Sequence, residues 1–280
     1  MRRSLLLAAA LACMSLPATA DTLAKIKDSG MISIGIRQDA KPFSFIDGAG
    51  HAAGYSVQVC DAVAKAVQQQ LGLPELKVEY KLVTAENRFQ LLQDGTVDLD
   101  CGVTTYSLGR LADVDFSLLI FATGADMMVR RDAVIAGLPD LGGKTVGVLA
   151  GSTGEHEMNQ LLAASGLTAT VTPLPTYTDM LASLETEEVD AVFGDRALLL
   201  EARARALDPA ALKVLGNKYS YEPYALALRR DDNAFRQAVD AALARLYRTD
   251  QIVKIHELWF GPVGDDPETA ALYRLLGLPD

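Results

Sequence analysis

The sequence predicts an α/β protein with two lobes, each a mostly parallel sheet flanked by helices. Three observations carry this prediction. Strand-like and helix-like segments alternate through two consecutive units of about a hundred residues each, with no sequence repetition beyond this order. An extended apolar segment follows each unit, which indicates that the chain crosses between two lobes twice. A long amphipathic segment near the C-terminus needs a core to pack on.

In the first unit, segments with the two-residue periodicity of a strand alternate with segments that have the 3.6-residue periodicity of a helix. Alternating isoleucines in "MISIGIR" are typical of a strand, and "GYSVQVCDAVAKAVQQQLG" has apolar residues at helical spacing before a terminating glycine. Thr84 is a suitable N-cap, and Gly95 a suitable terminator, for a short helix. The expected order is a strand over 31–37, a helix over 54–72, a strand over 76–83, a helix over 84–95 and a strand over 97–102.

The second unit repeats this order. We expect a strand, a loop and a helix over 141–166, a strand over 168–174, a helix over 177–188 and a strand over 189–195. The crossing segments are 116–131 and 217–228, and the amphipathic segment 232–260 is expected to be one long helix that returns to the first lobe. We therefore assign residues 21–122 and 222–262 to lobe 1, 123–221 to lobe 2, and 263–280 to a C-terminal tail. The tail is either a short packed helix or a frayed end.

Residues 1–20 predict export. They run from two arginines through an apolar stretch to the small residues 18–20, the pattern that a signal peptidase cuts. The apolar stretch is shorter than the roughly 20 residues that a membrane span needs, which argues against an anchor. Ala10 stands where a lipid-attachment site around Cys13 usually has leucine, which argues against lipidation. We expect cleavage after Ala20 and a soluble exported protein.

The composition limits the kinds of partner that the protein is expected to bind. The chain has 26 basic and 36 acidic residues, and removing the two arginines of the signal segment changes its net charge from −10 to −12. Such a field repels nucleic acid and anionic membranes, so we expect neither as a partner. The histidines His51, His156 and His256 are scattered without metal-ligand spacing, so we expect no metal and no cofactor. The sequence leaves open whether Cys60 and Cys101 pair, although an exported protein permits disulfides.

Candidate site residues lie where the expected strands end, because ligands of open α/β sheets bind beyond the carboxyl ends of the strands. The turn "AGSTGEHE" presents free N–H groups and the positive end of a helix dipole to an anion, but it lacks the lysine of a nucleotide-phosphate loop. The candidates are Arg37, Arg88, the loop 103–110, Ser152 with Thr153, and Asp195.

This set offers cations and hydroxyls for a carboxylate and an acid for an ammonium, which are the demands of an amino-acid zwitterion. No Ser, His and Asp or Cys and His arrangement is recognisable as a nucleophile system, so binding is favoured over catalysis.

Each candidate also has a purely structural interpretation. Arg88 lies in the first turn of its helix, where a cation is disfavoured by roughly 0.3–1 kcal/mol, and it could be a surface arginine with a solvated head. Arg37 could pair with Asp39, and Asp195 could cap the helix that follows it. The turn "AGSTGEHE" could be a simple helix cap.

Several segments together resemble the periplasmic amino-acid-binding proteins of ABC importers, the family-three solute-binding proteins. The resemblance runs from about Leu23 to Phe260 and rests on "GIRQDAKPFSF", "GYSVQVCDAVAKAV", "ENRFQLLQDGTVDLDCGVTT", the arginine and "DFS" of "GRLADVDFS", and "LAGSTGE". It implies the type II periplasmic-binding-protein fold, with two lobes that are joined by two hinge strands and close on a ligand. It further implies a periplasmic monomer without enzymatic activity that docks on an inner-membrane permease.

The resemblance also implies roles for individual residues. At the place of Val103 a backbone carbonyl meets the ligand's α-ammonium, and at Thr105 a hydroxyl adds to it. Arg110 clamps the α-carboxylate through a two-pronged contact. From the second lobe, Thr153 meets the α-carboxylate and Asp195 meets the α-ammonium.

Within the family, the glutamate and aspartate binders are the closest likeness. They carry arginines at the places of Arg37 and Arg88 that bind the side-chain carboxylate, and both are present here. This sequence departs at Ala85 and Val103, which stand in place of serines, and at Tyr177, which stands in place of histidine and which we count among the ligand-binding residues. A preference for glutamine, asparagine or a wider range of polar amino acids therefore stays open.

An enzyme is the alternative class. Some exported dehydratases that process cyclohexadienyl amino acids such as prephenate and arogenate resemble this fold, and their chemistry needs a protonated carboxyl in the cleft as general acid. Glu155 and Glu187 are the candidates for it near the cleft, but the sequence favours a position on a helix surface for both.

Overall fold

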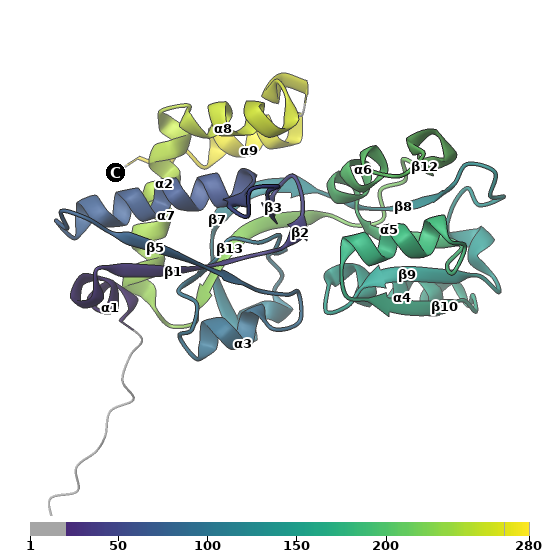
Figure 1. Cartoon of the computed structure of the whole chain (residues 1–280), viewed down its shortest axis with the longest axis horizontal. Coiled ribbons are helices and arrows are strands. Elements are labelled where there is room, and N and C mark those ends of the chain that lie inside the picture. The colour runs from purple at the N-terminus through teal and green to yellow at the C-terminus, as the bar shows by residue number, and fades with distance from the viewer. Residues whose placement is uncertain (1–20, 266, 280) are drawn as a thin grey trace, which may run out of the picture.

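The computed structural model describes residues 21–265 and 267–279, which form two lobes (Figure 1). The predicted signal segment and its cleavage site after Ala20 lie outside the described residues. Across the described part of the chain, no helix is long and apolar enough to cross a membrane. Each lobe is built on a five-stranded sheet with helices against it, so the predicted α/β class is confirmed.

The sheet of lobe 1 has the strand order β5–β1–β6–β13–β7. β1 runs parallel to β5 and β6, whereas β13 runs antiparallel to β6 and β7. Two strands that lead to and from the other lobe thus extend the parallel strands of the first unit. The alternating isoleucines of β1 are all buried. The strands are β1 (Met31–Ile36), β5 (Lys77–Leu82), β6 (Leu99–Asp100), β7 (Val114–Thr123) and β13 (Glu222–Arg229).

Helices cover both faces of this sheet. α2 packs against α7 on one side, and Figure 1 shows α3 on the other. α1 and a small sheet of β2, β3 and β4 were not predicted from the sequence. The helices are α1 (Thr22–Ser29), α2 (Tyr55–Gln70), α3 (Arg88–Gln93), α7 (Asn233–Arg248), α8 (Gln251–Phe260) and α9 (Pro267–Leu275), and the small sheet contains β2 (Asp39–Ala40), β3 (Ser44–Ile46) and β4 (Ala52–Ala53).

The expected single helix over 232–260 is wrong, because the segment forms two helices, α7 and α8. Asp250 adopts the left-handed conformation with φ of 54°, which aspartate tolerates better than most residues. The Thr249 hydroxyl donates to the carbonyl of Arg245 at 2.8 Å, which satisfies one of the last carbonyls of α7. The break lets α8 bury Ile252 and His256 in the core of lobe 1.

The sheet of lobe 2 has the order β10–β9–β11–β8–β12, in which β9, β10 and β11 are parallel and β8 is antiparallel to both its neighbours. Its elements β9, α4, β10, α5 and β11 lie where the second unit was predicted, β8 lies in the predicted crossing segment, and α6 and β12 were not among the elements predicted for that unit. The elements of lobe 2 are β8 (Ala125–Arg130), β9 (Thr145–Leu149), α4 (Thr153–Ser165), β10 (Thr170–Leu174), α5 (Tyr177–Glu185), β11 (Ala191–Asp195), α6 (Arg196–Ala204) and β12 (Leu212–Val214).

The chain crosses between the two sheets at two neighbouring places. It leaves lobe 1 where β7 passes through Gly124 into β8, and it returns between β12 and β13. A Cβ at Gly124 would lie 2.5 Å from the backbone oxygen of Ser220, so the two crossings touch there without room for a side chain. Glu222, which begins β13, pairs with Thr123 at the end of β7. The two crossings thus connect the lobes side by side at one place.

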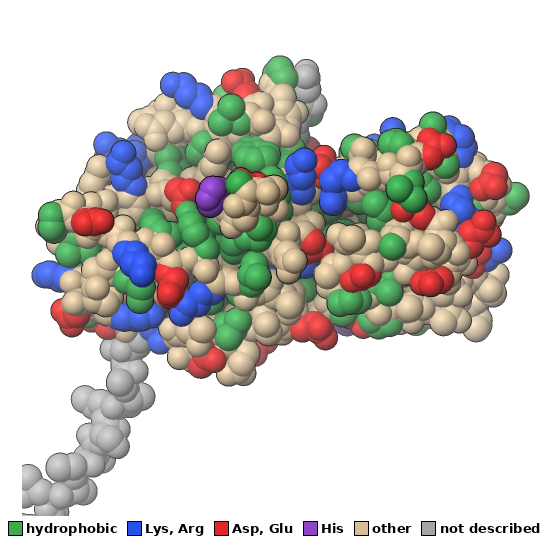
Figure 2. All heavy atoms as spheres, in the orientation of Figure 1, with side chains coloured by type: hydrophobic (Ala, Val, Ile, Leu, Met, Phe, Trp, Pro, Cys, Tyr) green, Lys and Arg blue, Asp and Glu red, His purple; other side chains and the backbone are tan. Residues whose placement is uncertain are grey.

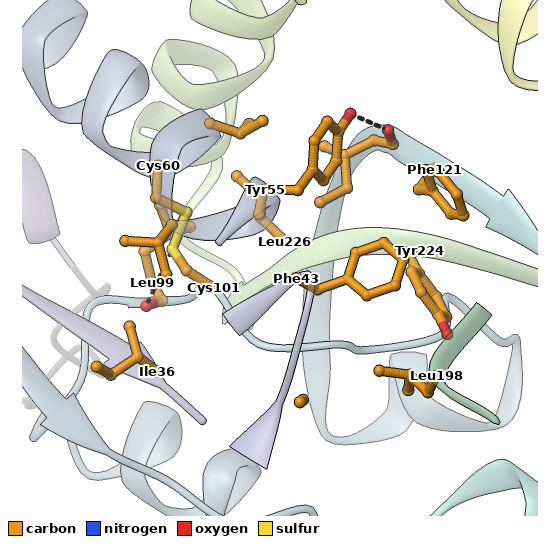
Figure 3. Packing of buried hydrophobic residues seen from close by; sticks show 14 of the residues in the cluster. Ile36, Phe43, Tyr55, Cys60, Leu99, Cys101, Phe121, Leu198, Tyr224 and Leu226 are labelled. Carbon is orange, nitrogen blue, oxygen red and sulfur yellow. Dashed lines mark hydrogen bonds between the residues drawn. A yellow bond between two sulfur atoms is a disulfide. The ribbon is translucent and has the colours of Figure 1, made fainter. Parts of the chain in front are cut away.

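A disulfide between Cys60 and Cys101, which the sequence left open, joins α2 to the end of β6, with the two Cα atoms 6.3 Å apart. Figure 3 shows it beside Leu99 and Ile36 in the core of lobe 1. The same view shows Phe43 between Tyr55 and Tyr224, and the ring centres of Phe43 and Tyr224 lie 5.2 Å apart. The loop that follows Cys101 is therefore tied to the core.

Replacing both cysteines with serine should lower the free energy of unfolding by about 4 kcal/mol, because the crosslink closes a loop of 41 residues in the unfolded chain. Urea unfolding of the oxidised protein and the double variant measures this difference. Reductant should destabilise the wild type and leave the variant unchanged. A loss below about 1 kcal/mol would contradict the prediction.

Candidate functional site

The nine predicted site residues all line one pocket, together with Ala85 and Leu149. They come from both lobes and from the carboxyl ends of parallel strands, as ligand sites of open α/β sheets do. In lobe 1 they follow β1 or β6 or begin α3, and in lobe 2 they follow β9, begin α5 or end β11. The residues are Arg37, Arg88, Val103, Thr105, Arg110, Ser152, Thr153, Tyr177 and Asp195.

Arg88 forms a buried cationic wall of the pocket, with 3% of its surface exposed. Its Nη1 donates to the carbonyl of Ala85, its guanidinium lies 4.6 Å from the centre of the Phe89 ring, and its Nε has no partner in the described part of the chain. Burial, followed by the charge of Arg110, lowers the pKa of Arg88 to about 9. The interpretation of Arg88 as a solvated surface arginine is therefore wrong.

Arg37 makes the ion pair that its structural interpretation required. Its Nη2 lies 3.2 Å from Oδ1 of Asp39. Asp39 Oδ2 also accepts the backbone N–H of Tyr177 at 2.7 Å, so this carboxylate links lobe 1 to the first turn of α5. Burial raises the pKa of the Tyr177 hydroxyl, whose ring lines the pocket from lobe 2.

Arg110 lies on the loop 103–110 and is positioned by it. Its Nη1 donates to the carbonyl of Thr105 at 2.9 Å, and its guanidinium lies 5.5 Å from the centre of the Phe89 ring. The loop is itself hydrogen-bonded to β13, because Ala225 N–H donates to Thr104 and Tyr106 N–H donates to Pro223. Burial lowers the pKa of Arg110. Part of its guanidinium fork stays available to a ligand.

Asp100, on whose carboxyl the charges of Arg88 and Arg37 act, was not among the predicted residues. It is buried at the end of β6, accepts the Thr104 hydroxyl at 2.7 Å through Oδ2, and its Oδ1 has no partner in the described residues. Burial raises the pKa of this carboxyl, against the effect of Arg88.

Asp195 forms the acidic end of the pocket in lobe 2. Its Oδ2 accepts the hydroxyl of Tyr224, which reaches across from β13. Burial, followed by the charge of Glu222, raises the pKa of Asp195 to about 7. Although Asp195 stands at the N-cap position of α6, its side chain makes no capping hydrogen bond, so the capping interpretation is wrong.

Glu222 is a second buried acid at this end, with 3% of its surface exposed, and the sequence analysis missed it. Its Oε2 accepts the hydroxyls of Thr105 at 2.6 Å and Thr153 at 2.8 Å, and its Oε1 accepts that of Ser220 at 2.7 Å. An acid inside the apolar return segment "NKYSYEPYALAL" was the available signal.

The turn before α4 is a helix cap, as its structural interpretation required. Ser152 donates to the carbonyl of Leu149 at 2.7 Å and accepts the N–H of Glu155 at 3.1 Å. Glu155 in turn accepts the N–H of Gly151 at 2.8 Å, and Glu187 stands in an exposed turn after α5. Neither glutamate lines the pocket, whose carboxyl Asp195 is instead hydrogen-bonded by Tyr224.

The two lobes touch across the pocket. Besides the contacts of Asp39 and Glu222, the hydroxyls of Thr105 and Thr153 lie 3.4 Å apart. Residues of both lobes therefore line the pocket and also contact one another across it. On the face shown in Figure 2, acidic and basic side chains are interspersed over both lobes. Of the three arginines of the pocket, Arg37 and Arg88 are buried and Arg110 is half-buried.

Chemically, the pocket has a cationic end in lobe 1 and an acidic end at Asp195 and Glu222. Guanidinium groups bind carboxylates, and carboxylates bind an ammonium. Within the residues that the structure describes, no group of three or more histidines, cysteines or acids could hold a metal ion. Two lobes joined by paired crossings, with a charged pocket between them, define a solute-binding protein.

The chain belongs to the bacterial extracellular solute-binding proteins, family 3, whose family model matches residues 32–262. It is 37% identical over 254 residues to the L-glutamate/L-aspartate-binding protein of Pseudomonas aeruginosa, covering 89% of this chain and 84% of that protein. It is 33% identical over 244 residues to the glutamate/aspartate import solute-binding protein of Salmonella typhimurium, covering 87% of this chain and 81% of that protein.

Among solved structures, the fold is similar to that of an ancestral amino-acid-binding protein described as a precursor of cyclohexadienyl dehydratase. The TM-score is 0.75 at 26% identity, with 86% of this chain and all of that one covered. The predicted family and the type II periplasmic-binding-protein fold are confirmed.

Proposed function

We propose that this protein captures an acidic L-amino acid, glutamate or aspartate, in the pocket between its lobes and delivers it to an inner-membrane permease. The observation that carries the proposal is the charge of the pocket. Arg37 is paired with Asp39, whereas neither Arg88 nor Arg110 is in an ion pair with any described residue. A buried guanidinium (Arg88) and a half-buried one (Arg110), both without an ion pair, are costly, and a ligand with two carboxylates neutralises both.

In this proposal the ligand's α-carboxylate binds Arg110, and its side-chain carboxylate binds Arg88, with Arg37 beside it. The α-ammonium lies at Asp195, close to Thr105 and the carbonyl of Val103. The names of the relatives, a glutamate/aspartate binder and a glutamate/aspartate importer component, support this assignment. Ala85 and Tyr177 line the pocket where the resemblance led us to expect serine and histidine, so the side-chain carboxylate relies on the arginines.

The proposal places the mature chain in the periplasm as a monomer, after cleavage behind Ala20. Because contacts from both lobes hold the ligand, the ligand stabilises the closed form, which the permease recognises. We assign the hinge to the two crossings, lobe 1 to residues 21–122 and 222–262, and lobe 2 to 123–221.

Calorimetric titration of the mature protein, refolded to remove carried-over ligand, tests the function. We expect micromolar or tighter binding, a free energy of about −8 kcal/mol or better, for glutamate and aspartate and much weaker binding for glutamine and asparagine. Equal affinity for glutamine and asparagine would support the receptor function but contradict the specificity for acidic amino acids. Absence of heat with every amino acid would overturn the receptor function, and turnover of prephenate or arogenate would then establish the dehydratase.

The affinity for glutamate should fall as the pH is lowered through 7. Asp195, whose pKa is raised to about 7 by burial and by Glu222, must be ionised to bind an ammonium, so each unit below that pKa should weaken binding about tenfold. The carboxylates of glutamate stay ionised between pH 5.5 and 8. Titrations across this range should also show proton release on binding below pH 7.

The variant Asp195→Asn is the control for this pH dependence, and it should bind glutamate weakly at every pH with a flat profile. An affinity of the wild type that is constant, or that rises in acid, would contradict the assignment of the ammonium to Asp195.

A further inference from the structure

Glu222 occupies a position that links both lobes to the return crossing. It is the first residue of β13, and its Oε2 accepts one hydroxyl from lobe 1, that of Thr105, and one from lobe 2, that of Thr153. Its other oxygen accepts the hydroxyl of Ser220 from the crossing itself. These three hydrogen bonds satisfy a carboxylate that is buried at the edge of the pocket.

The direction of these hydrogen bonds decides what the two threonines offer to a ligand. A hydroxyl has one hydrogen and two lone pairs, and an ionised carboxylate only accepts. The hydroxyls of Thr105 and Thr153 therefore both donate their hydrogen to Glu222, and only their oxygen lone pairs are left to accept a hydrogen bond from a ligand in the pocket. An acceptor suits an ammonium, which has three hydrogens to donate, and does not suit a carboxylate.

We propose that Glu222 is a positioning residue that fixes the hydroxyls of Thr105 and Thr153 as acceptors and thereby makes the acidic end of the pocket selective for an ammonium group. This inference rests on the proposed binding of an amino acid. The resemblance implied that Thr153 meets the α-carboxylate. With its hydroxyl turned to Glu222, the donors left for that carboxylate in lobe 2 are the N–H groups at the start of α4.

The charges at this end favour the same ligand group. Glu222 and Asp195 are both buried acids, and the charge of Glu222 opposes ionisation of Asp195. A cation that binds close to two neighbouring carboxylates favours the ionised form of both. A dicarboxylate without an ammonium would bring no such cation, so Glu222 acts against it as well as for an amino acid.

The test compares L-glutamate with glutarate, which has the same two carboxylates and no ammonium, in the wild type and in Glu222→Gln. Titrations at pH 8.5 keep Asp195 ionised in both proteins, and glutarate is measured by competition up to millimolar concentration. We expect the variant to bind L-glutamate about 10- to 100-fold more weakly, the usual effect of losing hydrogen bonds to a charged group. Its affinity for glutarate should stay within threefold of the wild type or rise.

Equal weakening of both ligands would overturn the inference, because a residue that only supports the fold affects both alike. Glu268→Gln is the matched control, since Glu268 binds Lys218 of the return crossing from the exposed side of α9 and should change neither affinity. A wild type that binds no amino acid would overturn the proposed function itself, whereas a wild type that binds glutamate with an unchanged preference in Glu222→Gln would overturn this inference alone.

A second variant separates Glu222 from its partners. In a protein with Thr105→Val and Thr153→Val, the hydroxyls that Glu222 orients are gone, so adding Glu222→Gln should weaken L-glutamate binding less than threefold further. Losses that multiply independently would show that Glu222 does not act through the threonines and would contradict the proposal. Thermal unfolding of each variant confirms that it is folded before titration.

Discussion

Replacing Arg110 with alanine is expected to abolish measurable binding of every amino acid, a loss of more than about a hundredfold. The α-carboxylate is common to all of them, and a buried carboxylate without its cation costs about 2–5 kcal/mol. Arg110→Lys should not restore binding, because the guanidinium already uses Nη1 on the Thr105 carbonyl and binds the ligand with its remaining donors, which a single ammonium cannot do.

Calorimetric titration with glutamate, aspartate and glutamine measures the effect of Arg110→Ala. Arg236→Ala is the matched control, because this arginine lies on α7 outside the pocket and pairs with Asp240. Full affinity in Arg110→Ala would show that the α-carboxylate binds elsewhere.

Replacing Arg88 with methionine is expected to weaken glutamate binding by about a hundredfold or more and glutamine binding far less. Only the acid brings a negative charge to this guanidinium. The same change should raise the thermal stability of the ligand-free protein, because it removes a buried cation whose Nε has no partner and whose pKa is lowered by burial. In Arg88→Met, the affinity for glutamate is thus expected to fall while the melting temperature of the ligand-free protein rises.

Arg37→Met provides the comparison for Arg88→Met. It removes the partner of Asp39 and leaves that carboxylate unpaired, so the ligand-free protein should become less stable. If Arg88→Met lost the same affinity for glutamate as for glutamine, the proposed specificity for acidic amino acids would be refuted, whereas the proposed function as an amino-acid receptor would stand.

Much of the fold was predictable because it depends on local patterns. The isoleucines of β1 alternate, α2 carries its apolar residues at helical spacing, and the same order recurs in the second unit. The break between α7 and α8 was not predictable, because neither proline nor glycine marks it and an aspartate adopts the left-handed conformation. The disulfide depends on how α2 lies over β6, which no local pattern encodes.

The site was predictable where a single rule governs it. Residues at the carboxyl ends of parallel strands meet at one edge of each sheet, and the nine named from that rule and from the family resemblance line one pocket. Glu222 was not predicted because it lies 117 residues further along the chain than its partner Thr105, on the strand that leads back into lobe 1. Its role follows from contacts across both lobes, which only the assembled structure brings together.

A crystal structure of the refolded mature protein with L-glutamate tests the central claim most directly. We predict the α-carboxylate on Arg110, the side-chain carboxylate on Arg88, and the ammonium on Asp195 and the hydroxyl oxygens of Thr105 and Thr153. A ligand bound outside this pocket, or with its ammonium toward the arginines, would contradict the account.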